Sequence, residues 1–92
     1  MAPSAYIPPS LQGLVDQAVA DLSARLNIDR ASIAAISAKA VEWPDRSMGC
    51  PQPGMGYLQV PVDGAVIELS VGSTTYRYHS GGSVAPFLCK KA

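Results

Sequence analysis

Three residues of this chain, Asp45, Ser47 and His79, are the types that form a hydrolytic triad. Asp45 and Ser47 are only two positions apart in a segment rich in proline and glycine, and no nucleophile-elbow pattern surrounds Ser47. Short polar side chains in such segments commonly hydrogen-bond to nearby backbone amides. We therefore expect Asp45 and Ser47 to cap amides of a loop and His79 to bond to that loop, and we expect no catalytic residues and no enzymatic activity.

The two cysteines, Cys50 and Cys89, favour a disulfide over a metal site. A structural zinc site usually needs four ligands, and only His79 could join the cysteines as a soft donor. A metal site made of His79, Asp45 and Glu42 is supported no better by the sequence than a zinc site with the two cysteines. We expect no metal, no cofactor and a Cys50–Cys89 bridge, which implies a secreted, periplasmic or cell-envelope protein. Two buried thiols are the alternative.

The segment from Trp43 to Tyr57 makes unusual demands on the backbone. It holds three prolines, three glycines and the single tryptophan of the chain. Proline lacks a backbone donor and glycine carries a large entropic cost, so the composition predicts a long, shaped loop. Loops of this length often bind a partner, although this one could merely cross between sheet edges.

The predicted binding residues of this loop are Ser47, Met48, Gly49, Pro51, Gln52, Pro53, Met55 and Tyr57. We expect Trp43, Asp45 and His79 to support the loop from below. Met48 and Met55 have flexible apolar side chains suited to a specificity pocket.

The aromatic residues allow two interpretations. Trp43, Tyr57, Tyr76 and Tyr78 could form a platform for a sugar or a peptide. Alternatively, Trp43 and at least one tyrosine seal the core below the loop, because aromatic side chains bury the largest apolar areas. We favour core packing, with Tyr57 as the exception.

An amphipathic helix is predicted over residues 10–26, where apolar residues recur at steps of three and four. Ser10 is the expected N-cap and Asn27 the expected left-handed residue after the helix. Asp21 and Arg25 have the spacing of a favourable ion pair.

Strand-like runs follow the helix at residues 33–43, 56–62, 65–71, 74–79 and 84–89. Asp63-Gly64 and Gly72-Ser73 are typical hairpin turns, and a further turn is expected at residues 80–83. The fold class is therefore α+β: one N-terminal amphipathic helix packed on a four- or five-stranded antiparallel meander, with one disulfide. Residues 1–9 are expected to form an extended, proline-rich leader of the kind that follows a cleaved export signal, and residues 10–92 a single domain.

Charge and hydropathy exclude two classes of partner. The 92 residues include seven basic and seven acidic side chains, which provides no electrostatic surface for nucleic acid or an anionic membrane. No apolar run approaches the ~20 residues needed to span a bilayer. Lys90 and Lys91 are expected to be a solvated tail, and the oligomeric state is left open.

Four features of the chain occur together: the W-x-D-x-S-x-G-C-P-x-P-G segment from Trp43 to Gly54, the pair Gln59-Val60, the Y-x-Y-H strand from Tyr76 to His79, and the final Cys89. Together they resemble a largely uncharacterised family of small secreted bacterial domains. The resemblance spans residues 10–89 and implies the helix-and-sheet fold and export. It also implies that Trp43, Asp45, Ser47, Cys50 and His79 belong to one connected feature.

A second likeness is to cystatin-type inhibitors, which wrap a sheet around a helix and present a Q-x-V-x-G hairpin to a protease. Here the corresponding stretch is Gln59 to Gly64, one residue longer than that motif. Together, these patterns predict a secreted, non-enzymatic binding domain, most specifically a protease inhibitor that presents the 43–57 loop. A carbohydrate- or envelope-binding module and a structural scaffold are the alternatives.

Overall fold

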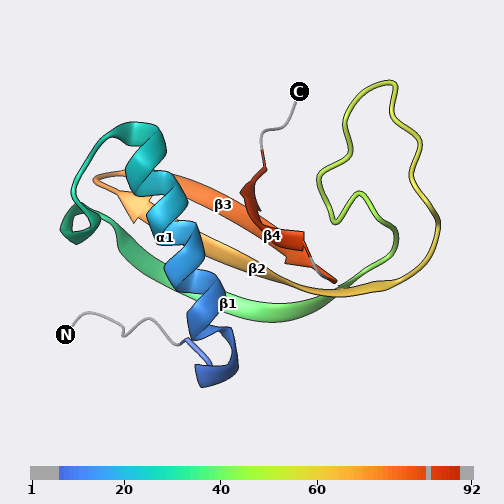
Figure 1. The fold of residues 1–92 in the computed structure, drawn as a ribbon, viewed down its shortest axis with the longest axis horizontal. Helices are drawn as coiled ribbons and strands as arrows, with labels where there is room; N and C mark the ends of the chain where they lie inside the picture. Colours follow the sequence, from blue (N-terminus) through green and yellow to red (C-terminus); the bar gives the residue numbers. More distant parts are fainter. Residues whose placement is uncertain (1–6, 83, 90–92) are drawn as a thin grey trace.

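The chain folds as one helix packed across a four-stranded antiparallel sheet, as a computed structural model that describes residues 7–82 and 84–89. The helix α1 spans Gln12–Leu26, and the strands are β1 (Ala34–Trp43), β2 (Val62–Val71), β3 (Thr74–Gly81) and β4 (Val84–Leu88). The strands lie side by side in chain order, and α1 crosses one face of the sheet (Figure 1). The predicted α+β meander with one disulfide is confirmed.

The helix begins differently from the prediction and ends as predicted. Pro9 opens a 3₁₀ turn over Pro9–Leu11, so Ser10 lies inside this turn and Leu11 occupies the position before α1 without a side-chain cap. The predicted Ser10 N-cap is therefore wrong. At the other end, Asn27 adopts the left-handed conformation, with φ 54° and ψ 50°, and confirms its predicted role. Of the predicted leader, residues 1–6 lie outside the described residues.

The predicted strand at 56–62 and the Asp63-Gly64 turn are wrong. Residues 44–61 contain no strand, and Asp63 and Gly64 lie within β2. Prolines interrupt the backbone donors needed for a ladder in 51–61. Gly64 does not form a turn but allows the backbones of β2 and β3 to lie close together, because a Cβ there would lie 2.1 Å from the carbonyl oxygen of Ser80. The cystatin-like hairpin therefore does not form.

The other predicted turns and the first predicted strand agree better with the observed elements. Gly72 and Ser73 connect β2 to β3, as predicted. A 3₁₀ turn at Arg30–Ser32 and a bulge between Ala35 and Ser37 account for the irregular start of the first strand. Residues 80 and 81 extend β3, so the next turn begins later than predicted.

The apolar core lies between α1 and one face of the sheet. The helix contributes Val15, Ala18 and Leu22, and the preceding turn contributes Leu11. The strands contribute Ala38, Ala65, Ile67, Leu69 and Tyr78. Ala38, Ile67, Tyr78 and Leu88 occupy paired positions across all four strands.

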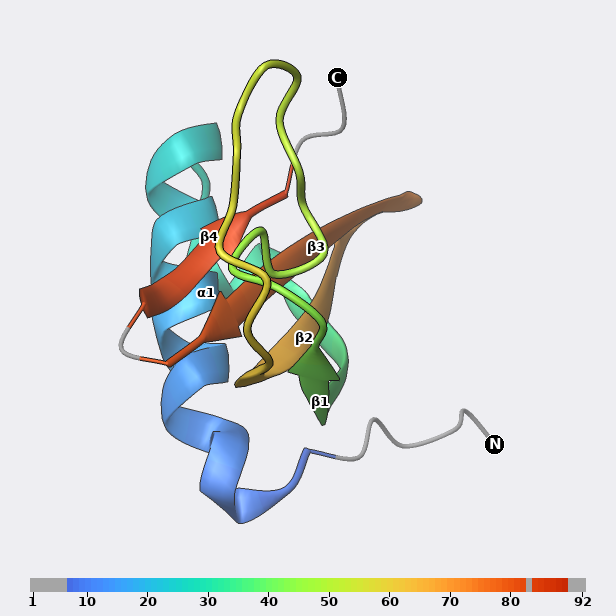
Figure 2. The same ribbon diagram turned by 90° about the vertical axis from the view of Figure 1, so that its right-hand side faces the viewer.

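The next row across the sheet faces away from α1, because successive side chains of a strand point to opposite faces. This row consists of Lys39, Val66, His79 and Phe87 at paired positions on β1, β2, β3 and β4. We call this side the open face, since no helix covers it (Figure 2). His79 is therefore directed away from the main core, toward the loop that joins β1 to β2.

One buried hydroxyl joins the helix to the sheet. Tyr78 is fully buried and donates its O–H to Asp21 Oδ2 at 2.7 Å. The same carboxylate pairs with Arg25 at 2.5 Å, as the sequence predicted. The hydrogen bond from Tyr78, and then the contacts with Arg25, lower the pKa of Asp21, while burial raises the pKa of Tyr78.

Replacing Tyr78 by phenylalanine should therefore lower the free energy of unfolding by about 1 kcal/mol at pH 7, because it removes one hydrogen bond to a carboxylate that stays hydrated. Asp21 has a depressed pKa in the folded state, so its contribution is complete above its ordinary pKa and is lost as the pH falls through the folded value. Urea unfolding should give a smaller difference between wild type and Tyr78→Phe at pH 2 than at pH 7. A difference that grows at low pH would contradict this assignment.

Candidate functional site

The loop over residues 44–61 joins β1 to β2 and extends beyond the end of the sheet (Figures 1 and 2). Neighbouring antiparallel strands need only a two-residue connection, so the length of this loop is not required by the topology. Its residues divide into two parts by burial and contacts. We call 44–50 the anchored half and 51–61 the exposed half.

The first anchor of the loop is His79. Its Nδ1 lies 2.7 Å from the carbonyl oxygen of Met48, so this nitrogen carries the proton and donates it. The imidazole stacks on the indole of Trp43 at a centroid distance of 4.8 Å and an interplanar angle of 22°. Phe87 packs edge-on against the imidazole, with the two ring centroids 6.2 Å apart. His79 is only 5% exposed, so this contact fixes the loop to a buried residue on the open face.

Trp43 is held in place by its own contacts. Its Nε1–H donates to the carbonyl oxygen of Ser80 at 2.8 Å. Gly49 and Gly64 approach the indole so closely that an added Cβ would lie 2.5 Å from Cζ3 and from Nε1, respectively. Trp43 thus seals the space below the anchored half, in line with the packing interpretation of the sequence.

The second anchor is the disulfide between Cys50 and Cys89, whose Cα atoms are 5.8 Å apart. Cys89 follows β4, and its amide donates to the carbonyl oxygen of Arg77 at 3.1 Å. Cys50 is buried. The bridge therefore joins the end of the anchored half to a position fixed by the last strand.

Asp45 and Ser47 shape the anchored half locally. Asp45 Oδ1 accepts hydrogen bonds from the amide of Ser47 at 2.9 Å and from its hydroxyl at 2.5 Å. These bonds, the hydroxyl first, hold the pKa of Asp45 below its ordinary value. The amide of Arg46 also donates to the carbonyl oxygen of Leu58 at 3.1 Å and closes the base of the loop.

This geometry gives the triad residue types a structural role. The hydroxyl of Ser47 donates to Asp45, and His79 Nδ1 donates to Met48. Within residues 7–82 and 84–89, no hydrogen bond joins Ser47 to His79. In the same residues no three side chains of His, Cys, Asp or Glu form a group that could hold a metal ion.

The exposed half presents apolar side chains to solvent. Met55, Leu58 and Val60 are 62, 66 and 42% exposed. Tyr57 is half-buried, and its hydroxyl accepts a hydrogen bond from the amide of Gln52 at 3.1 Å. This bond crosses the exposed half and ties its two limbs together.

The structure divides the predicted binding residues between the two halves. Ser47, Met48 and Gly49 lie in the anchored half, and Ser47 is buried. Pro51, Gln52, Pro53, Met55 and Tyr57 lie in the exposed half. Sequence reasoning missed Leu58 and Val60, because their apolar alternation was assigned to a strand; the flanking Gly56 and Pro61 were the signal against that assignment.

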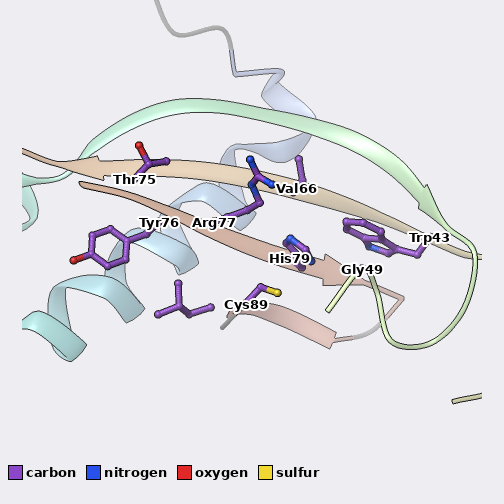
Figure 3. A pocket seen from close by; sticks show the side chains of 9 residues that line it. Trp43, Gly49, Val66, Thr75, Tyr76, Arg77, His79 and Cys89 are labelled. Carbon is purple, nitrogen blue, oxygen red and sulfur yellow. The ribbon is translucent and has the colours of Figure 1, made fainter. Parts of the chain in front are cut away.

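A groove of about 650 Å³ lies beside the anchored half on the open face (Figure 3). Trp43, Gly49, Val66, Arg77, His79 and Cys89 contribute to its walls. Figure 3 shows the imidazole of His79 between Trp43 and Arg77. His79 Nε2 is buried and has no hydrogen-bond partner among the described residues, so in the neutral ring it is an unpaired acceptor.

Comparison with known proteins places the chain in a family. A family model described as a domain of unknown function, DUF8738, matches residues 15–89. The chain belongs to the DUF8738 family. No curated protein and no solved structure matches it. The matched range contains the rest of α1 after its first turn, the four strands, the loop and both cysteines of this DUF8738 domain.

No helix within the described part of the chain has the length and apolar character needed to cross a bilayer.

Gly49 and Gly54 provide a matched pair of substitutions, because both have positive φ values, 74° and 79°. A Cβ at Gly54 would meet nothing within 4 Å, whereas one at Gly49 would collide with Trp43. Gly54→Ala should cost only the left-handed backbone strain of about 1 kcal/mol. Gly49→Ala should cost about 1–3 kcal/mol more, because the indole must move. Urea unfolding measures both, and near-UV circular dichroism should change for Gly49→Ala alone. Equal losses in the two variants would contradict the close contact.

Removing the disulfide should destabilise the domain by about 4 kcal/mol in the chain-entropy model, since the bridged cysteines are 39 residues apart. Cys50→Ser, Cys89→Ser and the double variant should lose similar amounts, because each loses the same bond. Limited proteolysis should then cut the exposed half faster than in the oxidised wild type. A double variant as stable as the wild type would show that the bridge does not hold the loop.

Proposed function

We propose that this DUF8738 domain is a secreted, non-enzymatic binding domain that presents the exposed half of its loop to a protein partner, and that this partner is a protease which the domain inhibits. The observation that carries the proposal is the combination of a fixed base and an exposed apolar tip. Fixing the loop before binding reduces the ordering cost that a flexible segment would incur.

The contacts at the base supply this rigidity. The His79–Met48 hydrogen bond and the disulfide hold the anchored half, and the Arg46–Leu58 bond closes the loop. Beyond these contacts, residues 56–61 contain no helix, strand or turn. An irregular segment held at its base is the form in which many protein inhibitors enter a protease cleft.

The exposed side chains support an apolar contact. Met55 and Leu58 are each more than half exposed and differ from the buried side chains of the core. Scattered exposed apolar residues are common on proteins, but here three lie within six residues of one loop. Met55 and Leu58 are therefore the side chains we assign to a specificity pocket of the partner.

The aromatic residues favour a protein partner over a glycan. Trp43 is occupied by its stack on His79 and its hydrogen bond to Ser80, and Tyr78 is fully buried. These contacts leave less of either ring available for sugar stacking. Secretion is supported by the disulfide, which persists in oxidising compartments.

The test is inhibition of a panel of serine and cysteine proteases by micromolar oxidised protein. We expect at least one enzyme to be inhibited, and Met55→Asp and Leu58→Asp to weaken inhibition at least about tenfold, because each places a charge in an apolar contact. Both variants should keep the thermal stability of the wild type, because these side chains make no core contacts. Ile36→Asp is the matched control, since Ile36 is 40% exposed on β1 and lies outside the loop.

No inhibition across the panel would overturn the protease assignment. Inhibition that survives both loop substitutions would instead overturn the assignment of the exposed half as the contact surface. Loss of inhibition in Ile36→Asp as well would point to a surface elsewhere on the sheet.

A further inference from the structure

A second hollow, of about 450 Å³, lies between the loop, β4 and the C-terminal turn of α1. Gln52 and Tyr57 of the exposed half line it, but Met55, Leu58 and Val60 do not, so it adjoins the apolar side chains assigned above to a protein partner without including them. Met48, Phe87 and Leu88 are the apolar side chains that line it. Arginine side chains also line it, so the hollow combines positive charge with apolar surface.

Two arginines, Arg25 and Arg46, line this hollow. Arg25 pairs with Asp21 through Nε, and its guanidinium also interacts with the hydroxyl of Tyr78. Arg46 is exposed, and its guanidinium makes no ion pair or hydrogen bond within the described residues. Arginine presents a planar set of donors that matches a carboxylate in a bidentate arrangement.

No acidic side chain among the described residues lines the hollow. Arg25 is paired with Asp21, so Arg46 is the arginine without an acidic partner there, because Asp45 is engaged by Ser47. Tyr57 also lines the hollow, and because its oxygen accepts from the amide of Gln52, its O–H remains free to donate. The lining therefore combines the guanidinium of Arg46, the hydroxyl of Tyr57 and the paired Arg25 with apolar side chains.

We propose that this hollow binds the carboxy-terminal residue of a polypeptide, with the free carboxylate at Arg25 and Arg46 and an apolar side chain on Met48, Phe87 and Leu88. A terminal residue carries its carboxylate and its side chain on the same carbon atom. An aspartate or glutamate side chain brings a carboxylate without an apolar group beside it. The mixed character of the hollow therefore fits a chain terminus better than an acidic side chain.

The experiment uses the full oxidised chain and a fluorescein-labelled peptide of glycine and serine that ends in leucine. Fluorescence anisotropy should show the free acid binding at least about tenfold more tightly than the same peptide with a terminal amide, since charge-assisted hydrogen bonds are lost with the charge. Affinity for the free acid should fall as salt is raised. A third peptide, amidated and carrying an internal glutamate, should bind no better than the plain amide.

Arg46→Gln should abolish the preference for the free acid, and Arg46→Lys should retain part of it because the charge remains. Arg30→Gln is the matched control, since Arg30 is exposed but does not line the hollow. Met55→Asp should leave peptide binding unchanged, which separates this test from that of the proposed protease contact. Circular dichroism checks that each variant is folded.

Three results would each overturn the proposal. The first is equal binding of the free acid and the amide, or no binding of either at millimolar peptide. The second is binding of the internal-glutamate peptide as tight as that of the free acid, and the third is an unchanged preference for the free acid in Arg46→Gln.

Discussion

The hydrogen bond from His79 to the carbonyl oxygen of Met48 is the contact on which the shape of the loop most depends. It joins a side chain fixed in the middle of a strand to a backbone atom of a segment that has no regular structure. Because His79 stacks on Trp43, the residue that ends β1, the same ring also fixes the direction in which the loop leaves the sheet. Removing the imidazole would therefore free both the exit and the middle of the anchored half.

The disulfide complements this contact and does not duplicate it. The His79 bond acts at Met48, and the bridge acts two residues later at Cys50. Met48 and Gly49, which precede Cys50, both have positive φ values. An L-residue such as Met48 adopts this conformation at a cost, so its neighbours must hold it there. Its sulfur lies beside Gly81, where a Cβ would be only 2.7 Å away.

The sequence was sufficient for the main elements and insufficient where glycine and proline had a tertiary role. The helix, the strand alternation in 65–71 and the disulfide follow from local periodicity and from the cysteine count. Gly64 was misread as a turn residue because its contacts with Ser80 and Trp43 are distant in sequence. Ser10 was misread as a cap because Pro9 starts a 3₁₀ turn one residue earlier.

In the loop, too, local features could be predicted from the sequence and tertiary ones could not. The residue types of the Trp43–Cys50 segment indicated that Asp45 would cap an amide and that His79 would bond to the loop, and both contacts are present. Which loop side chains face solvent could not be read from the sequence, because Met48 and Met55 are chemically identical. Only the left-handed backbone at Met48 and the position of Gly81 turn one methionine inward and leave the other exposed.

The arrangement also explains how so small a domain carries an exposed loop without losing its fold. One helix can cover only one face of the sheet, so the row of Lys39, Val66, His79 and Phe87 would otherwise remain open. The anchored half covers part of this row and acts as a partial second layer. The exposed half then makes few contacts with the core, so its side chains can change with little effect on the free energy of unfolding. The contacts that stabilise the loop and the side chains that it exposes therefore lie in separate segments.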